Sequence, residues 1–184
     1  GYSIEFTGVS NIMQESLNSL KTALLVAMLL VYMVMAAQFE SLMSPLIIMF
    51  SIPLAAIGSV FGLLLAGSRL GVMAVVGIIV LVGIVVNNAI LMVDSINRLR
   101  KERRDLRSAI LDAGTERLRP ILMTALTTIV GLFPLAFGVG RYIGFGEGTE
   151  TQKPLAVAVM GGLLSSTLLT LIVIPTIYEL VHGW

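Results

Sequence analysis

Long apolar stretches separated by short polar connections dominate the pattern of the chain. Five stretches carry no charged side chain and contain at least 18 residues each: 22–39, 41–68, 70–93, 120–140 and 154–178. About 18 to 20 apolar residues are enough for a helix to cross the hydrocarbon of a bilayer. The pattern therefore predicts an all-α integral membrane protein, a five-helix bundle with spans near 22–38, 45–66, 72–96, 120–138 and 154–181.

The segment before the first span has a different pattern. Residues 2–7 alternate apolar and polar side chains, as in a β-strand, and Gly8 ends the alternation. Between Ser10 and Lys21 apolar residues recur at helical spacing, which predicts an amphipathic helix approaching the membrane. We therefore expect residues 1–21 to form a strand and an approach helix, and residues 22–184 to form the membrane domain.

Charge is concentrated in the connection 97–119, between the third and fourth spans. It holds eight of the twelve Lys and Arg residues of the chain, so the positive-inside rule places it in the cytoplasm. Leu99, Leu106, Ile110 and Leu111 fall on one side of a helix, which predicts an interfacial helix. Its charges would bind anionic lipid or only fix the topology, and the second interpretation is favoured. Five crossings then put the N-terminus outside and the C-terminus in the cytoplasm.

Composition narrows the possible classes of protein. Hydrophobic residues make up 57% of the chain and charged residues 12%, with a mean hydropathy of +0.96, which is outside the range of soluble domains. The absence of cysteine excludes disulfides, iron–sulfur clusters and thiolate zinc sites. His182, the only histidine, is expected to be solvated near the end of the chain. No metal, cofactor or nucleic acid partner is predicted, whereas membrane lipid is.

Small residues and prolines within the spans predict how the helices pack and bend. Two stripes of small residues recur at four-residue intervals: Gly58, Gly62 and Ala66 in the second span, and Ala158, Gly162 and Ser166 in the fifth. Such stripes allow membrane helices to approach closely. Pro53, Pro134 and Pro175 lie inside their spans, where the missing N–H group is expected to cause kinks.

Polar side chains within the spans are the candidates for function, because each costs free energy in hydrocarbon unless it has a partner. The candidates are Asn87, Asn88 and Asp94 in the third span, and Arg117, Thr124 and Thr128 in or beside the fourth. The two groups lie at similar depth and would form a hydrogen-bonded structural lock or part of a proton pathway. Amides and hydroxyls do not titrate near neutrality, so alone they favour the lock. Asp94 is the nearest titratable group.

Several motifs resemble successive segments of resistance-nodulation-division transporters of the hydrophobe and amphiphile efflux type. The motifs are Phe39-Glu40-Ser41, GIVVNNAILMVD at 83–94, RLRPILMT at 117–124, GLFPL at 131–135 and Met160-Gly161-Gly162. The resemblance covers nearly the whole chain in order and spacing. It implies that the spans are helices eight to twelve of a twelve-helix subunit in the bacterial inner membrane. The strand near the N-terminus would then leave the second large periplasmic domain.

The resemblance also implies a mechanism and partners. In this family, proton flux drives the export of drugs or amphiphiles through a trimer, often with a periplasmic adaptor. An aspartate pair in the N-terminal half works with a lysine, an arginine and a threonine in the C-terminal half. Arg117 matches the arginine and Thr124 the threonine, whereas Asn87 occupies the lysine position. A neutral amide cannot exchange salt bridges, so we expect an altered charge balance or a different coupling ion.

An intramembrane enzyme and a standalone scaffold are the two other functions that such a membrane chain suggests. An intramembrane enzyme would need paired aspartates, a serine with a histidine, or metal ligands inside the spans, and the five spans hold none. A standalone five-helix scaffold remains open as an alternative. The chain begins with Gly1 rather than Met, and we expect it to be part of a longer protein that supplies the N-terminal half and the periplasmic domains.

Overall fold

The computed structural model describes residues 7–102, 105–138 and 149–182. These residues form helices and no strand, in the order α1 (Thr7–Phe39), α2 (Met43–Met49), α3 (Ser51–Leu65), α4 (Val72–Lys101), α5 (Leu106–Ala136) and α6 (Thr149–His182). Four spans have the length and apolarity needed to cross a membrane, or five when the two arms of the bent α6 are counted as one. The prediction of an all-α membrane bundle is confirmed.

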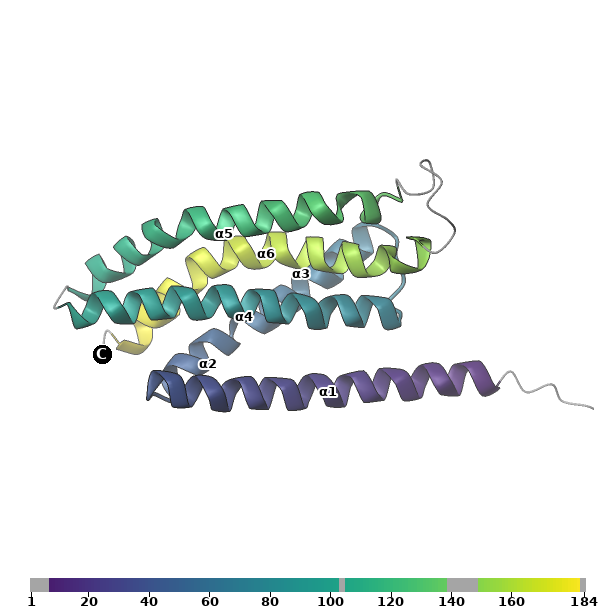
Figure 1. Ribbon diagram of the computed structural model, residues 1–184, viewed down its shortest axis with the longest axis horizontal. Helices are drawn as coiled ribbons and strands as arrows, with labels where there is room; N and C mark the ends of the chain where they lie inside the picture. Colours follow the sequence, from purple (N-terminus) through teal and green to yellow (C-terminus); the bar gives the residue numbers. More distant parts are fainter. Residues whose placement is uncertain (1–6, 103–104, 139–148, 183–184) are drawn as a thin grey trace, which may run out of the picture.

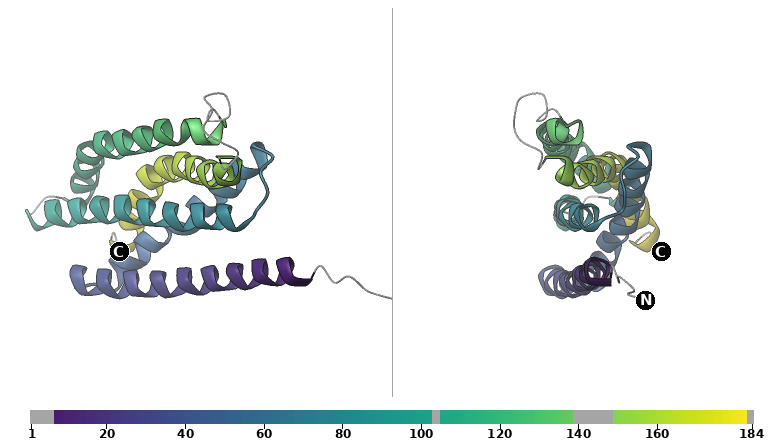
Figure 2. Two further views of the ribbon diagram at one scale, coloured as in Figure 1. Left: turned by 45° about the vertical axis from the view of Figure 1, so that its right-hand side comes forward. Right: turned by 90° about the vertical axis from the view of Figure 1, so that its right-hand side faces the viewer.

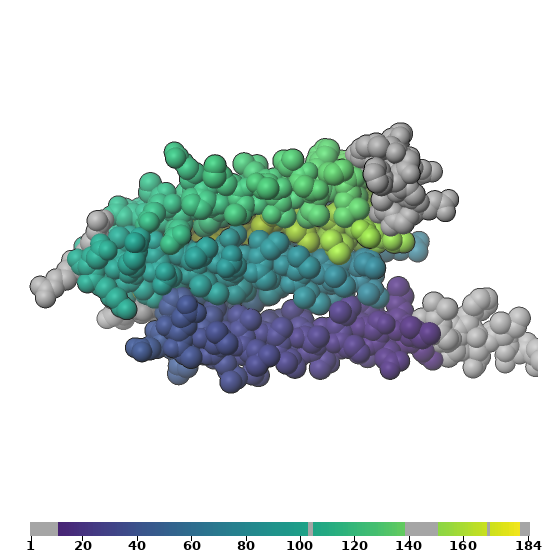
Figure 3. Space-filling view, in the orientation of Figure 1, coloured from purple at the N-terminus to yellow at the C-terminus, as the bar shows by residue number. Residues whose placement is uncertain are grey.

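The long helices lie side by side, with α6 at the centre of the bundle (Figure 1). α6 packs against α3, α4 and α5, whereas α1 contacts only the short α2 and α4 to any extent. The space-filling view shows α1 as a ridge along one edge of the molecule (Figure 3). Only 6% of its most apolar window is buried, against 44% for α4. Most of α1 therefore presents its side chains to the surroundings.

α1 is a single continuous helix where the sequence suggested two segments. It begins at Thr7, so the expected approach helix and the first span are one element of 33 residues. No proline interrupts this stretch, and side-chain polarity alone does not end a helix. The expected strand at residues 2–7 lies outside the described residues, apart from Thr7, which starts α1.

The second span is broken into α2 and α3 at Phe50. Pro53 accounts for the position of the break. It has no N–H group for the carbonyl of Met49, four residues earlier, and its ring crowds that carbonyl. α2 ends at Met49, and α3 begins two residues later. The kink expected at Pro53 thus appears as a local break one turn before the proline, at Phe50, whose backbone angles stay helical.

The basic connection does not form a separate interfacial helix in the described residues. Its first residues extend α4 to Lys101, and residues 106–119 are the start of α5, which continues through Pro120. The first part of α5 is bent away from the rest of the helix (Figure 2, left). Pro120 therefore lies within α5 instead of starting a new helix, because one missing hydrogen bond can bend a long helix without ending it.

α6 bends by 46° between Thr151–Leu168 and Thr170–Leu180. Pro175 lies one turn beyond the bend and leaves the carbonyl of Leu171 without its helical donor. The bent arm of α6 packs beside α2 and α3, where Ser51 and Thr170 border the same small void. The bend in α6 therefore lies near the break between α2 and α3.

Glycine allows the backbones of α3 and α6 to touch. A Cβ atom on Gly62 would lie 2.9 Å from the Cα of Gly161, and one on Gly58 would lie 2.3 Å from the Cβ of Ser165. One helical position further along, a Cβ on Gly162 would lie 2.1 Å from the side chain of Leu81 on α4 and 2.4 Å from the hydroxyl oxygen of Ser59 on α3. The two glycines thus let α6 pack closely against both α3 and α4.

Candidate functional site

Two polar residues at adjacent positions of α4 have different surroundings. Asn88 is buried, with 8% of its surface exposed. Asn87 is exposed and borders an otherwise apolar hollow of about 270 Å³ between α1 and α4. Only Asn87 can therefore meet a group that approaches from outside the bundle.

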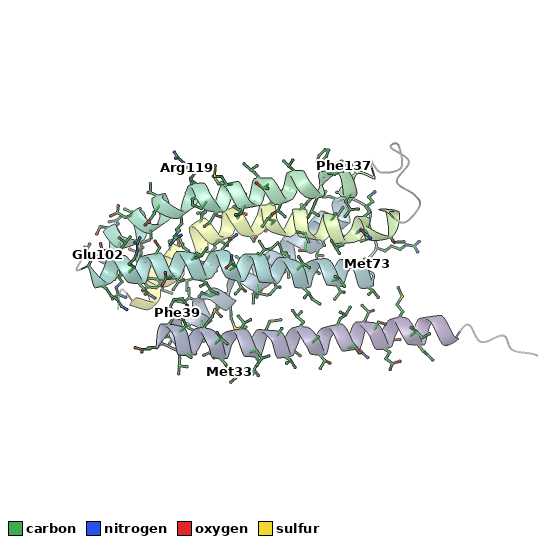
Figure 4. The ribbon with its side chains drawn as sticks, in the orientation of Figure 1. Met33, Phe39, Met73, Glu102, Arg119 and Phe137 are labelled. Atoms are coloured by element: carbon green, nitrogen blue, oxygen red, sulfur yellow. The ribbon has the colours of Figure 1, made fainter. Side chains whose placement is uncertain are left out.

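Asp94 lies two turns beyond Asn87, towards the last turn of α4. This turn carries Arg98, Arg100 and Lys101, and we call it the basic end. Asp94 is exposed and borders a polar cavity of about 740 Å³, which the turn between α1 and α2 shares with the ends of α4 and α6. In Figure 4, Phe39 and Glu102 mark this end of the bundle, and Met73 and Phe137 mark the opposite end. Asp94 is thus reached from the basic end, whereas Asn87 lies deeper.

On α5, the two predicted threonines form hydrogen bonds within their own helix. The hydroxyl of Thr124 donates to the carbonyl of Ile121 at 3.0 Å, and that of Thr128 donates to the carbonyl of Thr124 at 2.8 Å. Thr124 is exposed and Thr128 is half-buried. A hydroxyl that donates to its own backbone keeps its oxygen free to accept a hydrogen bond from another group.

Arg117 is the predicted residue whose surroundings are most incomplete. The residue is half-buried, and its Nε atom is buried without a hydrogen-bond partner in the described part of the chain. A guanidinium is always charged and presents five N–H donors, so burying one without an acceptor costs free energy. The arrangement requires an acceptor that the described residues do not supply.

The structure does not directly join the predicted polar residues of α4 to those of α5. In the described residues, none of the six predicted side chains forms a hydrogen bond between α4 and α5. A different group makes that connection at the basic end. Nη2 of Arg98 donates to both carboxylate oxygens of Glu116, at 3.0 and 3.1 Å, and the hydroxyl of Ser95 donates to the same carboxylate at 3.3 Å.

A second polar group at the basic end joins α4 to α6, and sequence reasoning missed it. The fully buried Tyr178 donates its hydroxyl hydrogen to Oδ1 of Asn97 and accepts a hydrogen bond from Nη1 of Arg100 at 3.3 Å. The guanidinium carbon of Arg100 also lies 5.9 Å from the centre of the Tyr178 ring. A tyrosine near the end of a span was the available signal, because such residues place an apolar ring in hydrocarbon and a hydroxyl at its edge.

The described residues contain no group of three or more His, Cys, Asp or Glu side chains that could hold a metal ion. The amides, the hydroxyls and the guanidinium of Arg117 can orient and stabilise a carboxylate, but they do not change their own charge near neutral pH.

Comparison with known proteins gives the family. The model of the AcrB/AcrD/AcrF family matches residues 1–182. The chain is 42% identical over 178 residues to the swarming motility protein SwrC of Bacillus subtilis (strain 168), covering 96% of the chain and 16% of SwrC. It is 38% identical over 182 residues to the cobalt-zinc-cadmium resistance protein CzcA of Cupriavidus metallidurans, covering 99% of the chain and 17% of CzcA.

Solved structures agree with this result. The chain superposes on crystal form II of a heavy metal efflux pump with a TM-score of 0.81 and 33% identity, over 95% of the chain and 16% of the pump. For crystal form I the TM-score is 0.69 and the identity 38%, over 88% of the chain and 16% of the pump. The chain thus spans about a sixth of the length of these relatives. It belongs to the AcrB/AcrD/AcrF family of resistance-nodulation-division efflux transporters and corresponds to a membrane portion of such a protein.

Proposed function

We propose that the chain is the C-terminal membrane half of a proton-driven efflux transporter and carries half of its proton relay. The observation that carries this proposal is Arg117, whose Nε atom is buried without an acceptor. Asn87 and Thr124 support it, because each exposes a polar side chain on a helix that is long and apolar enough to span a membrane. In hydrocarbon, such groups require a polar surface to cover them.

The missing partners would be carboxylates from the N-terminal half of the complete protein. An aspartate pair, as the family resemblance implies, would accept hydrogen bonds from the guanidinium of Arg117 and the amide of Asn87, and its protonated carboxyl group would donate one to the hydroxyl oxygen of Thr124. One fixed cation can balance one of two carboxylates. The other is then neutralised most readily by a proton, because two adjacent like charges disfavour each other.

Asn87 changes how such a relay works. A lysine would release one carboxylate by moving to another, whereas an amide stays neutral and can only rotate its donors and acceptor. In this protein, the uptake and release of a proton by the carboxylate pair would therefore be balanced by Arg117 alone. Asn87 would hold the pair in position.

We place the complete protein in the bacterial inner membrane as a homotrimer that works with a periplasmic adaptor. Its substrates would be drugs or other amphiphilic compounds, as the sequence motifs suggest. Heavy-metal cations are a second candidate, because CzcA and the solved pump are described by metal resistance or efflux. Susceptibility of a host without its own pumps, to dyes and detergents or to Co²⁺, Zn²⁺ and Cd²⁺, separates the two classes.

Alanine substitutions in the complete transporter test the relay. We expect Arg117→Ala and Thr124→Ala to reduce export to the level of an empty vector at normal membrane expression. Thr176→Ala is the matched control, since Thr176 is also an exposed threonine that donates to its own helix, at 2.6 Å from the carbonyl oxygen of Ile172. Export that persists in either relay variant, or is lost equally in the control, would refute the proposal.

A further inference from the structure

An apolar groove of about 720 Å³ runs along α6, between α3 and the end of α5. α6 contacts both of these helices and forms the floor, while α3 and α5 stand on either side of it (Figure 2, right). The face of α6 that meets α4 is a different one. Ala158 packs against Gly77 of α4 and Gly162 packs between α4 and α3, whereas Val157, Gly161 and Leu164 line the groove.

The floor of the groove is closed by direct contact between α3 and α6. Gly62 and Gly161 lie so close that a Cβ atom on either would be 2.9 Å from the Cα of the other. A molecule in the groove must therefore lie along the surface of the bundle, because it cannot pass between the two helices. This geometry suits a flexible chain that runs parallel to the helix axes.

The walls of the groove are exposed hydrocarbon side chains. Six of the large apolar residues that line it expose more than half of their surface: Ile57, Phe61, Leu65, Phe137, Leu164 and Leu168. Phe137, at the end of α5, shows where the groove lies along the bundle (Figure 4). On a helix inside a bilayer, such a surface is solvated by acyl chains.

Among the described residues that line the groove, Lys153 alone is charged, and it lies in the first turns of α6. From Lys153 to Leu168 the groove follows fifteen residues, or about 22 Å at about 1.5 Å per residue. One leaflet with its headgroup region is half of about 40–45 Å, or roughly 20–22 Å. The groove therefore matches one phospholipid in length, with its cation at the headgroup end.

We propose that this groove binds a phospholipid with an anionic headgroup, such as phosphatidylglycerol, in the leaflet remote from the basic connection between α4 and α5. One acyl chain lies along α6 between Phe61 and Phe137, and the phosphate meets the ammonium group of Lys153. Lysine binds phosphate as a point charge and needs no fixed orientation. This inference requires only that α3, α5 and α6 span the membrane, so it does not depend on the proton relay.

Quenching by brominated lipid tests the proposal in the complete transporter. The protein is reconstituted in phosphatidylcholine vesicles with an increasing fraction of phosphatidylglycerol that carries brominated acyl chains. Phe61→Trp reports on the groove, and Leu126→Trp, exposed on α5 outside the groove, reports on ordinary lipid contact. Fluorescence of the parent protein is subtracted. We expect half-maximal quenching of the Trp at position 61 at a roughly fivefold lower fraction of brominated lipid than at position 126. This is the preference that one lysine near a lipid phosphate provides.

A charge substitution separates the headgroup contact from the groove itself. Lys153→Gln should bring the quenching of the Trp at position 61 to that of the control position, whereas Lys21→Gln on α1 should not. Brominated phosphatidylcholine should show no preference for the groove. Equal quenching at positions 61 and 126, or a preference that survives Lys153→Gln, would overturn the proposal.

Discussion

Among single residues, Tyr178 combines full burial with hydrogen bonds to two side chains at the basic end of the bundle. Its ring is buried beside α2 and α4, and its hydroxyl joins Asn97 to Arg100. The residue thus supplies apolar bulk to the core and a polar tip to the cavity. It holds the bent arm of α6 against the end of α4.

Removing this hydroxyl should destabilise the protein measurably. We expect Tyr178→Phe to lower the free energy of unfolding by about 1 kcal/mol, because the half-buried Asn97 and the exposed Arg100 then lose a hydrogen-bond partner. Tyr32→Phe is the control, since its hydroxyl is exposed and lies 3.4 Å from the carbonyl oxygen of Leu42, and it should change stability by less than about 0.5 kcal/mol. Chemical unfolding in mixed detergent micelles measures both, and equal effects would contradict this account.

The sequence could indicate which polar residues lie in or beside the spans, but not what they contact. Asn87, Arg117 and Thr124 could be selected because polar groups in hydrocarbon are costly. Their expected opposition across α4 and α5 does not occur as a hydrogen bond, and we assign their partners to another part of the complete protein. Tyr178 and Asn97 are 81 residues apart, and no periodicity connects two such positions.

The length of the apolar stretches was enough to predict that the helices form. The points where they break or bend depend on prolines whose effects differ. Pro53 is preceded by a break, while Pro120 lies within a continuous α5. The sequence could not separate these outcomes, because they depend on the packing around each freed carbonyl. The sequence also predicted a separate interfacial helix for the basic connection 97–119, although most of this connection continues α4 and α5.

Restoring the missing donor at Pro53 should mend the broken span. Pro53→Ala supplies an N–H group to the carbonyl of Met49, and Pro53 is exposed, so the change opens no cavity. We expect amide hydrogen exchange over residues 50–54 to slow by roughly fivefold, because one added hydrogen bond stabilises the helix by about 1 kcal/mol. Pro45→Ala should leave this exchange unchanged, because Pro45 lies in the first turn of α2, where its N–H would have no helical acceptor. Unchanged exchange in Pro53→Ala would show that tertiary packing causes the break.

For the whole molecule, the charge distribution predicts the orientation in the membrane. The chain contains no cysteine, so in a cysteine-free background of the complete protein single substitutions can report the side. We expect Arg107→Cys to react with a membrane-impermeant thiol reagent only after the cytoplasmic side is opened, and Arg69→Cys to react in intact cells whose outer membrane is permeabilised. Both residues are exposed. The reverse pattern would contradict the assigned topology.

The bundle presents two chemically different surfaces. The polar residues Asn87 on α4 and Arg117 and Thr124 on α5 are proposed to meet the rest of the transporter, whereas the apolar groove runs along α6 with Lys153 at its end. α6 contacts α3, α4 and α5 and so holds the helices of both surfaces together. A change in the bend of α6 would therefore shift the helices that carry both surfaces.

Proton flux in proteoliposomes tests the central claim most directly. The complete transporter is reconstituted with a pH-sensitive dye on one side of the membrane, and substrate is added under a proton gradient or a sodium gradient. We predict that substrate export consumes the proton gradient, that a sodium gradient has no effect, and that Arg117→Ala abolishes the coupled flux while Thr176→Ala retains it. Export driven by sodium alone, or coupled proton flux that persists in Arg117→Ala, would contradict the proposed relay.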